Sequence, residues 1–309
     1  METAFLFSGQ GSQYVGMTKD LLSDFPQVSL MMEEACDIAG FQLDKICADG
    51  PAELLKETRY TQPALFIHEA ILWNLAKEYV DPIAFAGHSL GEYSALYAAG
   101  VLSFRDACSL VVLRGSIMFK AGEKQPGTMF AVIGLEDQKV EQLCQELSGK
   151  DGIIVAANYN SPGQIVLSGN AEYLRAQASL FKSAGARMVT ELQVSGAFHS
   201  PLMGSASEEL GKAIESTVFN MPNKPVYPNV HAQPISDQNQ LKQYLLQQLT
   251  SPVRWSQTIL NMYSSGIKNY CEIGPGKVLQ GLVKRSITAT DIAIQGIDTS
   301  HDIKLVQGI

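Results

Sequence analysis

Residues 83–99 read IAFAGHSLGEYSALYAA, in which a G-x-S-x-G motif at 87–91 separates an apolar run from a second, partly apolar run. The first run predicts a buried strand, and the second, from 92 to 99, predicts a helix. A serine on such a strand-to-helix turn is a nucleophile elbow, and its glycines permit a sharp turn. Backbone N–H groups at the start of the helix would stabilise an oxyanion. An ordinary turn is the plainer alternative, but the flanking runs favour Ser89 as a nucleophile.

The composition indicates a globular enzyme rather than a nucleic-acid-binding or membrane protein. The 309 residues are 46% hydrophobic and 17% charged, and the formal net charge is −8. That length suffices for one large core or two unequal subdomains, and the negative charge disfavours nucleic-acid binding. No apolar run is long enough to span a bilayer, and the first residues lack the basic stretch of a secretion signal.

The cysteines and histidines predict neither disulfides nor a metal centre. The five cysteines are widely spaced and include no C-x-x-C pair, which is typical of reduced thiols in the cytoplasm. The five histidines are not spaced as metal ligands. We therefore expect a cytoplasmic protein without a metal or other cofactor, and we take it to be a monomer.

Strands and helices alternate through most of the chain. We expect a strand at 4–7, a helix at 63–79, the strand and helix of the elbow, and a helix at 104–119. Later helices are expected at 203–215, 240–249 and 253–264, and later strands at 268–273 and 292–297. Alternation of this kind predicts a mostly parallel sheet covered on both faces, and therefore an α/β fold.

The segment 127–195 departs from this alternation. Its expected elements are a strand at 128–133, a helix at 136–147, strands at 153–157 and 164–168, a helix at 171–184 and a strand at 187–192. This βαββαβ order is that of a ferredoxin-like unit. Gly127 and the pair Ser195-Gly196 mark its two ends. We predict a large subdomain made of 1–126 and 196–309, with 127–195 inserted as a small subdomain.

A serine nucleophile requires a base, and His199 is the better placed of two candidates. It lies where the chain returns from the small subdomain to the large one, and clefts between domains are common ligand sites. His88 is the alternative, but it adjoins Ser89, so its side chain is expected to point away from the hydroxyl. No acidic residue lies near His199 in sequence, and a backbone carbonyl could orient the imidazole equally well.

Two further features lie outside the elbow. The loop SGQGSQ at 8–13 directly follows the first strand but lacks the pattern of a phosphate-binding loop. It could instead donate a second backbone N–H to an oxyanion, beside that of Leu90. Arg114 lies among apolar residues midway along the helix at 104–119. It is either an ordinary solvated arginine or a cation that holds a substrate carboxylate.

Together, these motifs resemble those of the malonyl-CoA:acyl-carrier-protein transacylases of bacterial fatty-acid synthesis and of the related polyketide acyltransferase domains. The resemblance covers nearly the whole chain. It rests on GQGSQ at 9–13, TQPAL at 61–65, GHSLGEYSAL at 87–96, RG at 114–115, NSPGQ at 160–164, FHS at 198–200, SPVRW at 251–255 and GPGKVL at 274–279. It implies an α/β-hydrolase-like large subdomain with a ferredoxin-like insertion, in agreement with the expected order of elements.

The resemblance also implies roles for individual residues. Ser89 matches the serine that malonyl-CoA acylates, His199 matches its base, and Arg114 matches the arginine that pairs with the free malonyl carboxylate. Further matches are Gln10 and Leu90 to the oxyanion-hole N–H donors, Gln248 to the residue whose backbone carbonyl orients the base, and Gln62, His88, Asn160 and Phe198 to the substrate pocket. The implied reaction is ping-pong. The malonyl group passes to the serine, coenzyme A leaves, and the phosphopantetheine thiol of an acyl carrier protein then takes the malonyl group.

The chain departs from the family pattern in two places. The family usually has proline at the position of Ser8, and the serine is expected to loosen this loop slightly. The stretch around Phe198 and His199 looks closer to malonyl-selective polyketide enzymes, so a trans-acting polyketide acyltransferase stays an alternative. A serine hydrolase is a further alternative, but a hydrolase of neutral esters has no use for Arg114. A non-catalytic carrier-binding protein is disfavoured because both Ser89 and His199 are present.

Overall fold

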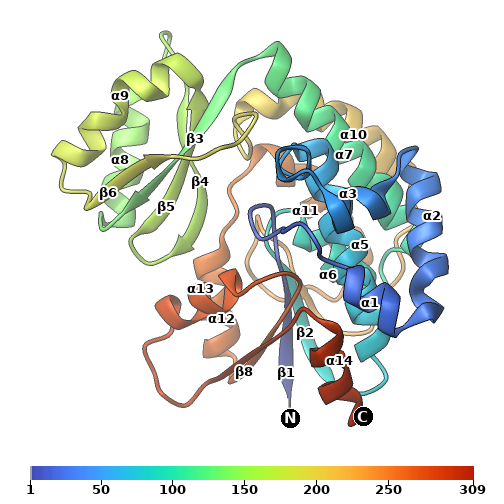
Figure 1. Ribbon diagram of the computed structural model, residues 1–309. Helices are drawn as coiled ribbons and strands as arrows, with labels where there is room; N and C mark the ends of the chain where they lie inside the picture. Colours follow the sequence, from blue (N-terminus) through green and yellow to red (C-terminus); the bar gives the residue numbers. More distant parts are fainter. Residues whose placement is uncertain (1) are drawn as a thin grey trace.

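The computed structural model describes residues 2–309 and contains two separate sheets (Figure 1). The larger sheet is parallel, with its strands in the order β7 (Val226–Tyr227), β2 (Pro82–Gly87), β1 (Thr3–Phe7), β8 (Asn269–Ile273) and β9 (Ala293–Ile297). Every residue of the central strand β1 is buried, as expected for a parallel sheet with both faces covered. The predicted parallel sheet is therefore confirmed.

Two different cores cover the two faces of this sheet. Phe5 and Phe7 of β1 belong to one core, whereas Ala4 and Leu6, which alternate with them, belong to the other. The first core includes side chains of α5 (Thr58–Ala76), α6 (Gly91–Ala98) and α7 (Phe104–Lys124). The second includes side chains of α12 (Trp255–Ser264) and α13 (Val278–Ser286). Packing on both faces of the sheet fixes the positions of the loops that follow β1 and β2.

Further helices complete this part of the chain. They are α1 (Lys19–Asp24), α2 (Ser29–Ala39), α3 (Leu43–Asp49), α4 (Ala52–Leu55), α10 (Gly204–Ser216), α11 (Gln238–Gln247) and α14 (Ser300–Gln307), with 3-10 turns at Pro26–Val28, Pro201–Met203 and Gln248–Thr250. Among the helices of the described residues, none combines the length and apolar character that crossing a bilayer requires.

The smaller sheet is antiparallel and carries its own core. Its strands lie in the order β4 (Ile154–Ser161), β5 (Gln164–Asn170), β3 (Gly127–Ile133) and β6 (Met188–Glu191). Helices α8 (Asp137–Leu147) and α9 (Ala171–Ser183) connect them and lie together beside this sheet (Figure 1). The predicted βαββαβ order is confirmed, with β5 inserted between the strands of a split βαβ unit.

Close backbone contacts join the two sheets. A Cβ on Gly122 would lie 1.7 Å from the carbonyl oxygen of Ser195, so the chain entering the small sheet runs against the chain leaving it. On the other side, the Val253 N–H donates to the Ala157 carbonyl (2.8 Å), and the Tyr159 N–H donates to the Val253 carbonyl (2.9 Å). The helix predicted from residue 253 therefore begins only at Trp255, because Val253 is paired with β4.

Several elements differ from the predicted ones. Helix α5 begins at Thr58, so that Pro63 lies inside it rather than at its start. Thr58, Thr61 and Gln62 are all buried, and this packing stabilises the extra turn despite the missing proline N–H. Helices α1–α4, α13 and α14 and strand β7 were not predicted. In the described stretch that holds α1–α4, no N-cap residue makes a side-chain capping bond, so the strongest local start signal is missing there.

Candidate active site

Ser89 lies on the turn between β2 and α6 with a backbone φ of 53°. This left-handed conformation is strained for a residue with a side chain and persists because the turn is tightly packed. A Cβ on Gly87 would lie 1.9 Å from the carbonyl carbon of Gly91, and one on Gly91 would lie 2.2 Å from the carbonyl oxygen of Phe7. Packing therefore requires both glycines, and the turn has the geometry of a nucleophile elbow.

Asn229 ties the two sides of this turn together. The Ser89 N–H donates to Asn229 Oδ1 (2.8 Å), and Asn229 Nδ2 donates to the Gly87 carbonyl (2.7 Å). The Asn229 N–H in turn donates to Glu92 Oε2 (3.0 Å). Sequence reasoning missed both residues. Glu92 stands inside the GHSLGE stretch, which was a usable signal, whereas nothing near Asn229 in the sequence indicates its part in the turn.

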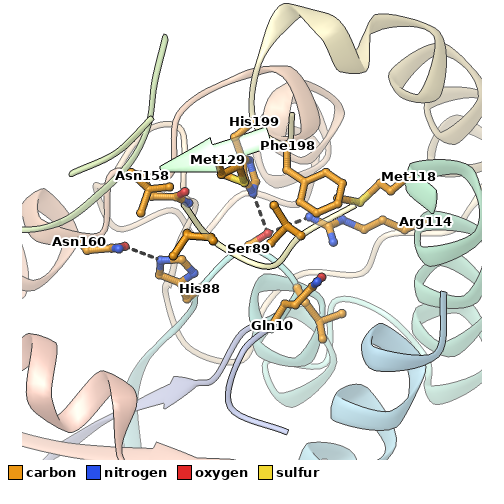
Figure 2. A pocket seen from close by; sticks show the side chains of 14 residues that line it. Gln10, His88, Ser89, Arg114, Met118, Met129, Asn158, Asn160, Phe198 and His199 are labelled. Carbon is orange, nitrogen blue, oxygen red and sulfur yellow. Dashed lines mark hydrogen bonds between the residues drawn. The ribbon is translucent and has the colours of Figure 1, made fainter. Parts of the chain in front are cut away.

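Ser89 and His199 meet although they are far apart in the sequence (Figure 2). The Ser89 Oγ lies 2.7 Å from His199 Nε2. On the other side of the ring, Nδ1 lies 3.0 Å from the Gln248 carbonyl oxygen and 3.2 Å from that of Ser251. A carbonyl only accepts hydrogen bonds, so Nδ1 carries the hydrogen and Nε2 presents its lone pair to the hydroxyl. Two backbone carbonyls thus occupy the place of the acid in a Ser-His-Asp triad.

The imidazole of His199 is neutral at ordinary pH. Burial, and secondly the positive charge of Arg114, lower the pKa of His199 to about 3. A neutral imidazole with its lone pair aimed at a serine hydroxyl can accept the proton of that hydroxyl.

The guanidinium of Arg114 is buried beside the nucleophile. Its Nη2 donates to Ser89 Oγ (3.0 Å), and its Nη1 donates to Gln62 Oε1 (2.7 Å). Its Nε–H finds no acceptor among residues 2–309. Burial lowers the pKa of Arg114, but a guanidinium in a protein keeps its charge. The alternative of a solvated arginine is therefore wrong, because only 1% of the residue is exposed.

Gln248 contacts both the base and the cation. Its backbone carbonyl faces His199, and its side-chain Oε1 accepts from Arg114 Nη2 (3.1 Å). Its Nε2 donates to the Ser89 carbonyl (2.8 Å) and to Glu92 Oε2 (2.8 Å). Burial raises the pKa of Glu92 to about 7, and the charge of Arg114 opposes this rise. The contacts of the Gln248 side chain were not expected from the sequence, which pointed only to its carbonyl.

His88 is turned away from the serine hydroxyl. Its Nε2 lies 2.9 Å from Asn160 Oδ1 (Figure 2). Its ring packs against Trp255 with 5.5 Å between ring centroids. Burial lowers the pKa of His88. The alternative in which His88 is the base is therefore wrong, and the pair with Asn160 forms part of the wall of the site.

A cavity of about 160 Å³ opens at Ser89 between the two sheets. Gln10, His88, Leu90, Phe198 and His199 line it from the large part of the chain. The small sheet contributes an expected residue, Asn160, and others that sequence reasoning missed, namely Met129, Asn158 and Val166. The segment after β6 adds Leu192 and Val194, which were missed as well. The predicted pocket residue Gln62 does not line the cavity, because it is buried behind Arg114 and holds the guanidinium.

Two backbone donors at the edge of the cavity have no protein partner. The N–H of Gln10, on the loop after β1, and that of Leu90, at the start of α6, donate to no acceptor in the described part of the chain. Both residues line the cavity. Unpaired N–H groups beside a nucleophile can stabilise an oxyanion that forms between them.

The chain is similar to known acyl transferases over nearly its whole length. The family model described as the acyl transferase domain matches residues 4–299. A malonyl CoA-acyl carrier protein transacylase of Haemophilus influenzae is 40% identical over 300 residues, which cover 94% of this chain and 96% of that protein. One of Staphylococcus aureus is 39% identical over 303 residues, covering 98% and 97% of the two chains.

Solved structures give the same result. An acyl carrier protein S-malonyltransferase from Vibrio cholerae superimposes with a TM-score of 0.93 and 38% identity, covering 99% of this chain and 100% of that one. The malonyl-transacylase PlMCAT, solved in complex with AntF, a type II polyketide synthase acyl-carrier protein, has a TM-score of 0.93 and 36% identity, with both chains covered completely. These similarities span both sheets and therefore the whole candidate site.

Proposed function

This chain belongs to the acyl transferase family that includes the malonyl-CoA:acyl carrier protein transacylases, and we propose that it moves a malonyl group from malonyl-CoA to an acyl carrier protein through an ester of Ser89. The proposal rests on the surroundings of one atom, Ser89 Oγ, which is the nucleophile and lies beside both a base and a cation. His199 Nε2 lies 2.7 Å from Ser89 Oγ, and Arg114 Nη2 lies 3.0 Å from the same oxygen. A nucleophile, a neutral base and a buried cation suit attack on a thioester that carries a carboxylate.

In the first half-reaction, His199 takes the proton of Ser89 as the serine oxygen attacks the thioester carbonyl. The carbonyl oxygen becomes negatively charged, and the free N–H groups of Gln10 and Leu90 stabilise it. The C–S bond then breaks, and the imidazolium returns the proton to the departing thiolate of coenzyme A. The products are coenzyme A and a malonyl ester of Ser89.

The guanidinium of Arg114 selects a substrate with a free carboxylate. Gln62 and Gln248 hold it from behind, so that it stays in the cavity without a carboxylate partner of its own. Its unpartnered Nε–H and the Nη2 now bonded to Ser89 offer donors to a planar carboxylate. Pairing of this kind would favour a malonyl group over an acetyl group.

In the second half-reaction, the phosphopantetheine thiol of an acyl carrier protein attacks the ester of Ser89. His199 takes the proton of the thiol, and the proton passes to Ser89 Oγ as the C–O bond breaks, which restores the free enzyme. The same N–H groups stabilise the second oxyanion.

We further propose that the enzyme works as a cytoplasmic monomer. All five of its cysteines are free thiols, which suits a reducing compartment. One chain supplies the complete cavity, with residues from 1–126 and 196–309 on one side and from 127–195 on the other. This division supports the proposed boundaries of the large and small subdomains.

The transferase proposal is tested by comparing transfer with hydrolysis. Mixing the enzyme with malonyl-CoA alone should release one equivalent of coenzyme A per active site in a burst. Further release, which requires water to attack the ester, should be at least about 100-fold slower than transfer to saturating holo-acyl carrier protein. Carrier protein without phosphopantetheine is the control, and it should accelerate nothing. Comparable rates of hydrolysis and transfer would favour the serine hydrolase instead.

The pH dependence tests the state of His199. Because its pKa lies near 3, the base stays unprotonated as the pH falls, and acylation is impaired only when the pH approaches that value. The rate of acylation by malonyl-CoA should therefore not decline from about pH 8 to about pH 5 through protonation of this imidazole. Rapid-quench measurement of the malonyl-enzyme gives this rate directly. A tenfold loss per pH unit below about 6.5 would instead identify an imidazole with an ordinary pKa.

The pathway is a separate question, because fatty-acid and polyketide enzymes use the same transfer chemistry. Similarity to curated transacylases favours a carrier protein of fatty-acid synthesis. Similarity to PlMCAT, which was solved with a polyketide carrier protein, keeps a trans-acting polyketide acyltransferase as the second candidate. Transfer rates measured side by side with the two classes of carrier protein distinguish them, and the true partner should give the higher kcat/KM.

A further inference from the structure

The proposed oxyanion hole is formed by two segments, here called its arms, whose backbones are in close contact. One arm is the loop after β1, which carries the N–H of Gln10, and the other is the start of α6, which carries the N–H of Leu90. A Cβ on Gly9 would lie 2.6 Å from the His88 carbonyl oxygen, and one on Gly91 would lie 2.6 Å from the Ser8 carbonyl oxygen. The separation of the two N–H groups therefore depends on how the loop is seated against the helix.

A buried carboxyl group lies behind both arms. Glu69, in the middle of α5, is completely buried, and its Oε1 accepts a hydrogen bond from Ser8 Oγ (2.7 Å). Ser8 is the first residue of the oxyanion loop. The other carboxyl oxygen, Oε2, has no partner within residues 2–309, and the same holds for the hydroxyl of Ser94 on α6. Helices α5 and α6 pack against one another, and the Ser94 side chain lies close enough to the Glu69 carboxyl group to influence its pKa.

A glycine makes room for this contact. Gly274, in the loop after β8, has a φ of +129°, and a Cβ there would lie 2.1 Å from Ser8 Oγ and 2.8 Å from Glu69 Oε1. The loop after β8 thus closes over the hydroxyl and the carboxyl and shields both from water. A residue with a side chain at position 274 would leave no room for the hydrogen bond between Ser8 and Glu69.

The surroundings of Glu69 favour a proton on the carboxyl group. Burial raises the pKa of Glu69 well above its ordinary value. The hydroxyls of Ser94 and Ser8 oppose this rise, and the negative charge of Glu272 on β8 adds to it. The other nearby titratable groups face elsewhere: Glu92 of α6 bonds Asn229 and Gln248, and His68 bonds Asp298. Since Ser8 donates to Oε1, a proton on Oε2 can be donated to Ser94 Oγ, which satisfies both unpartnered atoms.

We propose that Glu69 is a positioning residue, a carboxylic acid that bridges Ser8 and Ser94 and so holds the two arms of the oxyanion hole in register. The proposal rests on the transferase function above. It also corrects the expectation that serine in place of the family's usual proline loosens the loop. The hydroxyl of Ser8 anchors the loop to α5, and thereby to the sheet.

Three variants test the bridge through the single-turnover rate of malonyl-enzyme formation. Glu69→Gln keeps an acceptor for Ser8 and a donor for Ser94, and it should acylate at nearly the wild-type rate. Glu69→Leu fills similar space without either hydrogen bond, and its rate at saturating malonyl-CoA should fall roughly 10- to 100-fold, with the dissociation constant of malonyl-CoA little changed. Ser8→Ala removes one hydrogen bond and should cost roughly 5- to 10-fold.

A double variant and a matched control show whether Glu69 positions the oxyanion loop or only stabilises the fold. If Glu69 acts through Ser8, the Ser8→Ala/Glu69→Leu double variant should be no slower than Glu69→Leu. Tyr270→Phe is the control, because it removes one buried hydrogen bond, from the Tyr270 hydroxyl to the Ile267 carbonyl (2.9 Å), in the core on the other face of the sheet. It should change the melting temperature without changing the acylation rate. Should Glu69→Leu fail to fold, Ser8→Ala against Ser8→Thr, which keeps the hydroxyl, tests the same link.

The protonation of Glu69 is tested separately, through the pH dependence of the melting temperature. A carboxyl with a raised pKa in the folded state stabilises the protein most in acid, and this contribution is lost as the pH rises above the unfolded value of 4.5. The melting temperature of Glu69→Gln relative to wild type should therefore increase from about pH 5.5 to about pH 8.

A Glu69→Gln variant that is as slow as Glu69→Leu, or less stable than wild type at the higher pH, would overturn the proposal, as would wild-type rates in Glu69→Leu. Wild-type protein that forms no malonyl-enzyme would instead overturn the transferase function.

Discussion

Replacing Ser89 with alanine is expected to abolish the malonyl adduct that the enzyme forms with malonyl-CoA. Its Oγ is the oxygen that both His199 and Arg114 contact, and the variant leaves no other nucleophile in that place. His199→Ala should leave the nucleophile but remove its base, and acylation should slow by roughly 10²- to 10⁴-fold. Intact-mass analysis after incubation with malonyl-CoA measures both effects.

Matched controls keep this result specific. Ser216 is exposed on α10, and His301 is exposed on α14, so Ser216→Ala and His301→Ala make the same chemical changes away from the cavity. Both should form the adduct at the wild-type rate. A malonyl adduct on the Ser89→Ala protein would place the nucleophile elsewhere, and near-normal acylation by His199→Ala would mean that another group takes the serine proton.

Replacing Arg114 with alanine should have the second largest effect, and it should depend on the substrate. Loss of a charge-assisted bidentate contact in a largely dry cavity should cost malonyl-CoA roughly 2–5 kcal/mol in kcat/KM. Acetyl-CoA has no carboxylate, so its poor turnover should stay the same or improve. Arg114→Lys keeps a charge but not the planar fork, and should recover only part of the loss. Parallel kcat/KM measurements with the two thioesters give the selectivity ratio.

The ratio matters because Arg114 also has structural contacts. It bonds Gln62, Gln248 and the Ser89 hydroxyl, so its removal affects the site with any substrate. Such an effect lowers the rates with both thioesters and cancels in the ratio. Equal losses for malonyl-CoA and acetyl-CoA would make Arg114 a structural residue and leave the malonyl preference to other groups.

Much of the fold was predictable because its signals are local. The alternation of apolar runs with helical periodicity predicted the parallel sheet, and the change to βαββαβ order predicted the antiparallel sheet. The failures fall where local signals are weak or are overridden. Helices α1–α4 begin without side-chain capping bonds, and packing extends α5 toward the N-terminus beyond Pro63.

The candidate site was predictable to a lesser extent. The elbow around Ser89 is a contiguous motif, and His199 was chosen by its position at the return from the small subdomain. Arg114 could not be resolved from periodicity, because a helix of this composition leaves open whether one of its cations faces water or a cavity. Only the packing of α7 against α5, which brings Gln62 to the guanidinium, places it inside.

The sequence by itself determined where the turn that exposes Ser89 lies, because a glycine stands on each side of the serine between an apolar run and a helical run. The tertiary structure alone decided what surrounds that serine. Asn229 and Gln248 reach the turn from 140 and 159 residues further along the chain, and the Ser8 hydroxyl bonds Glu69 across 61 residues. Each of these contacts satisfies a buried polar group, and which group becomes buried beside which is known only once both sheets have packed.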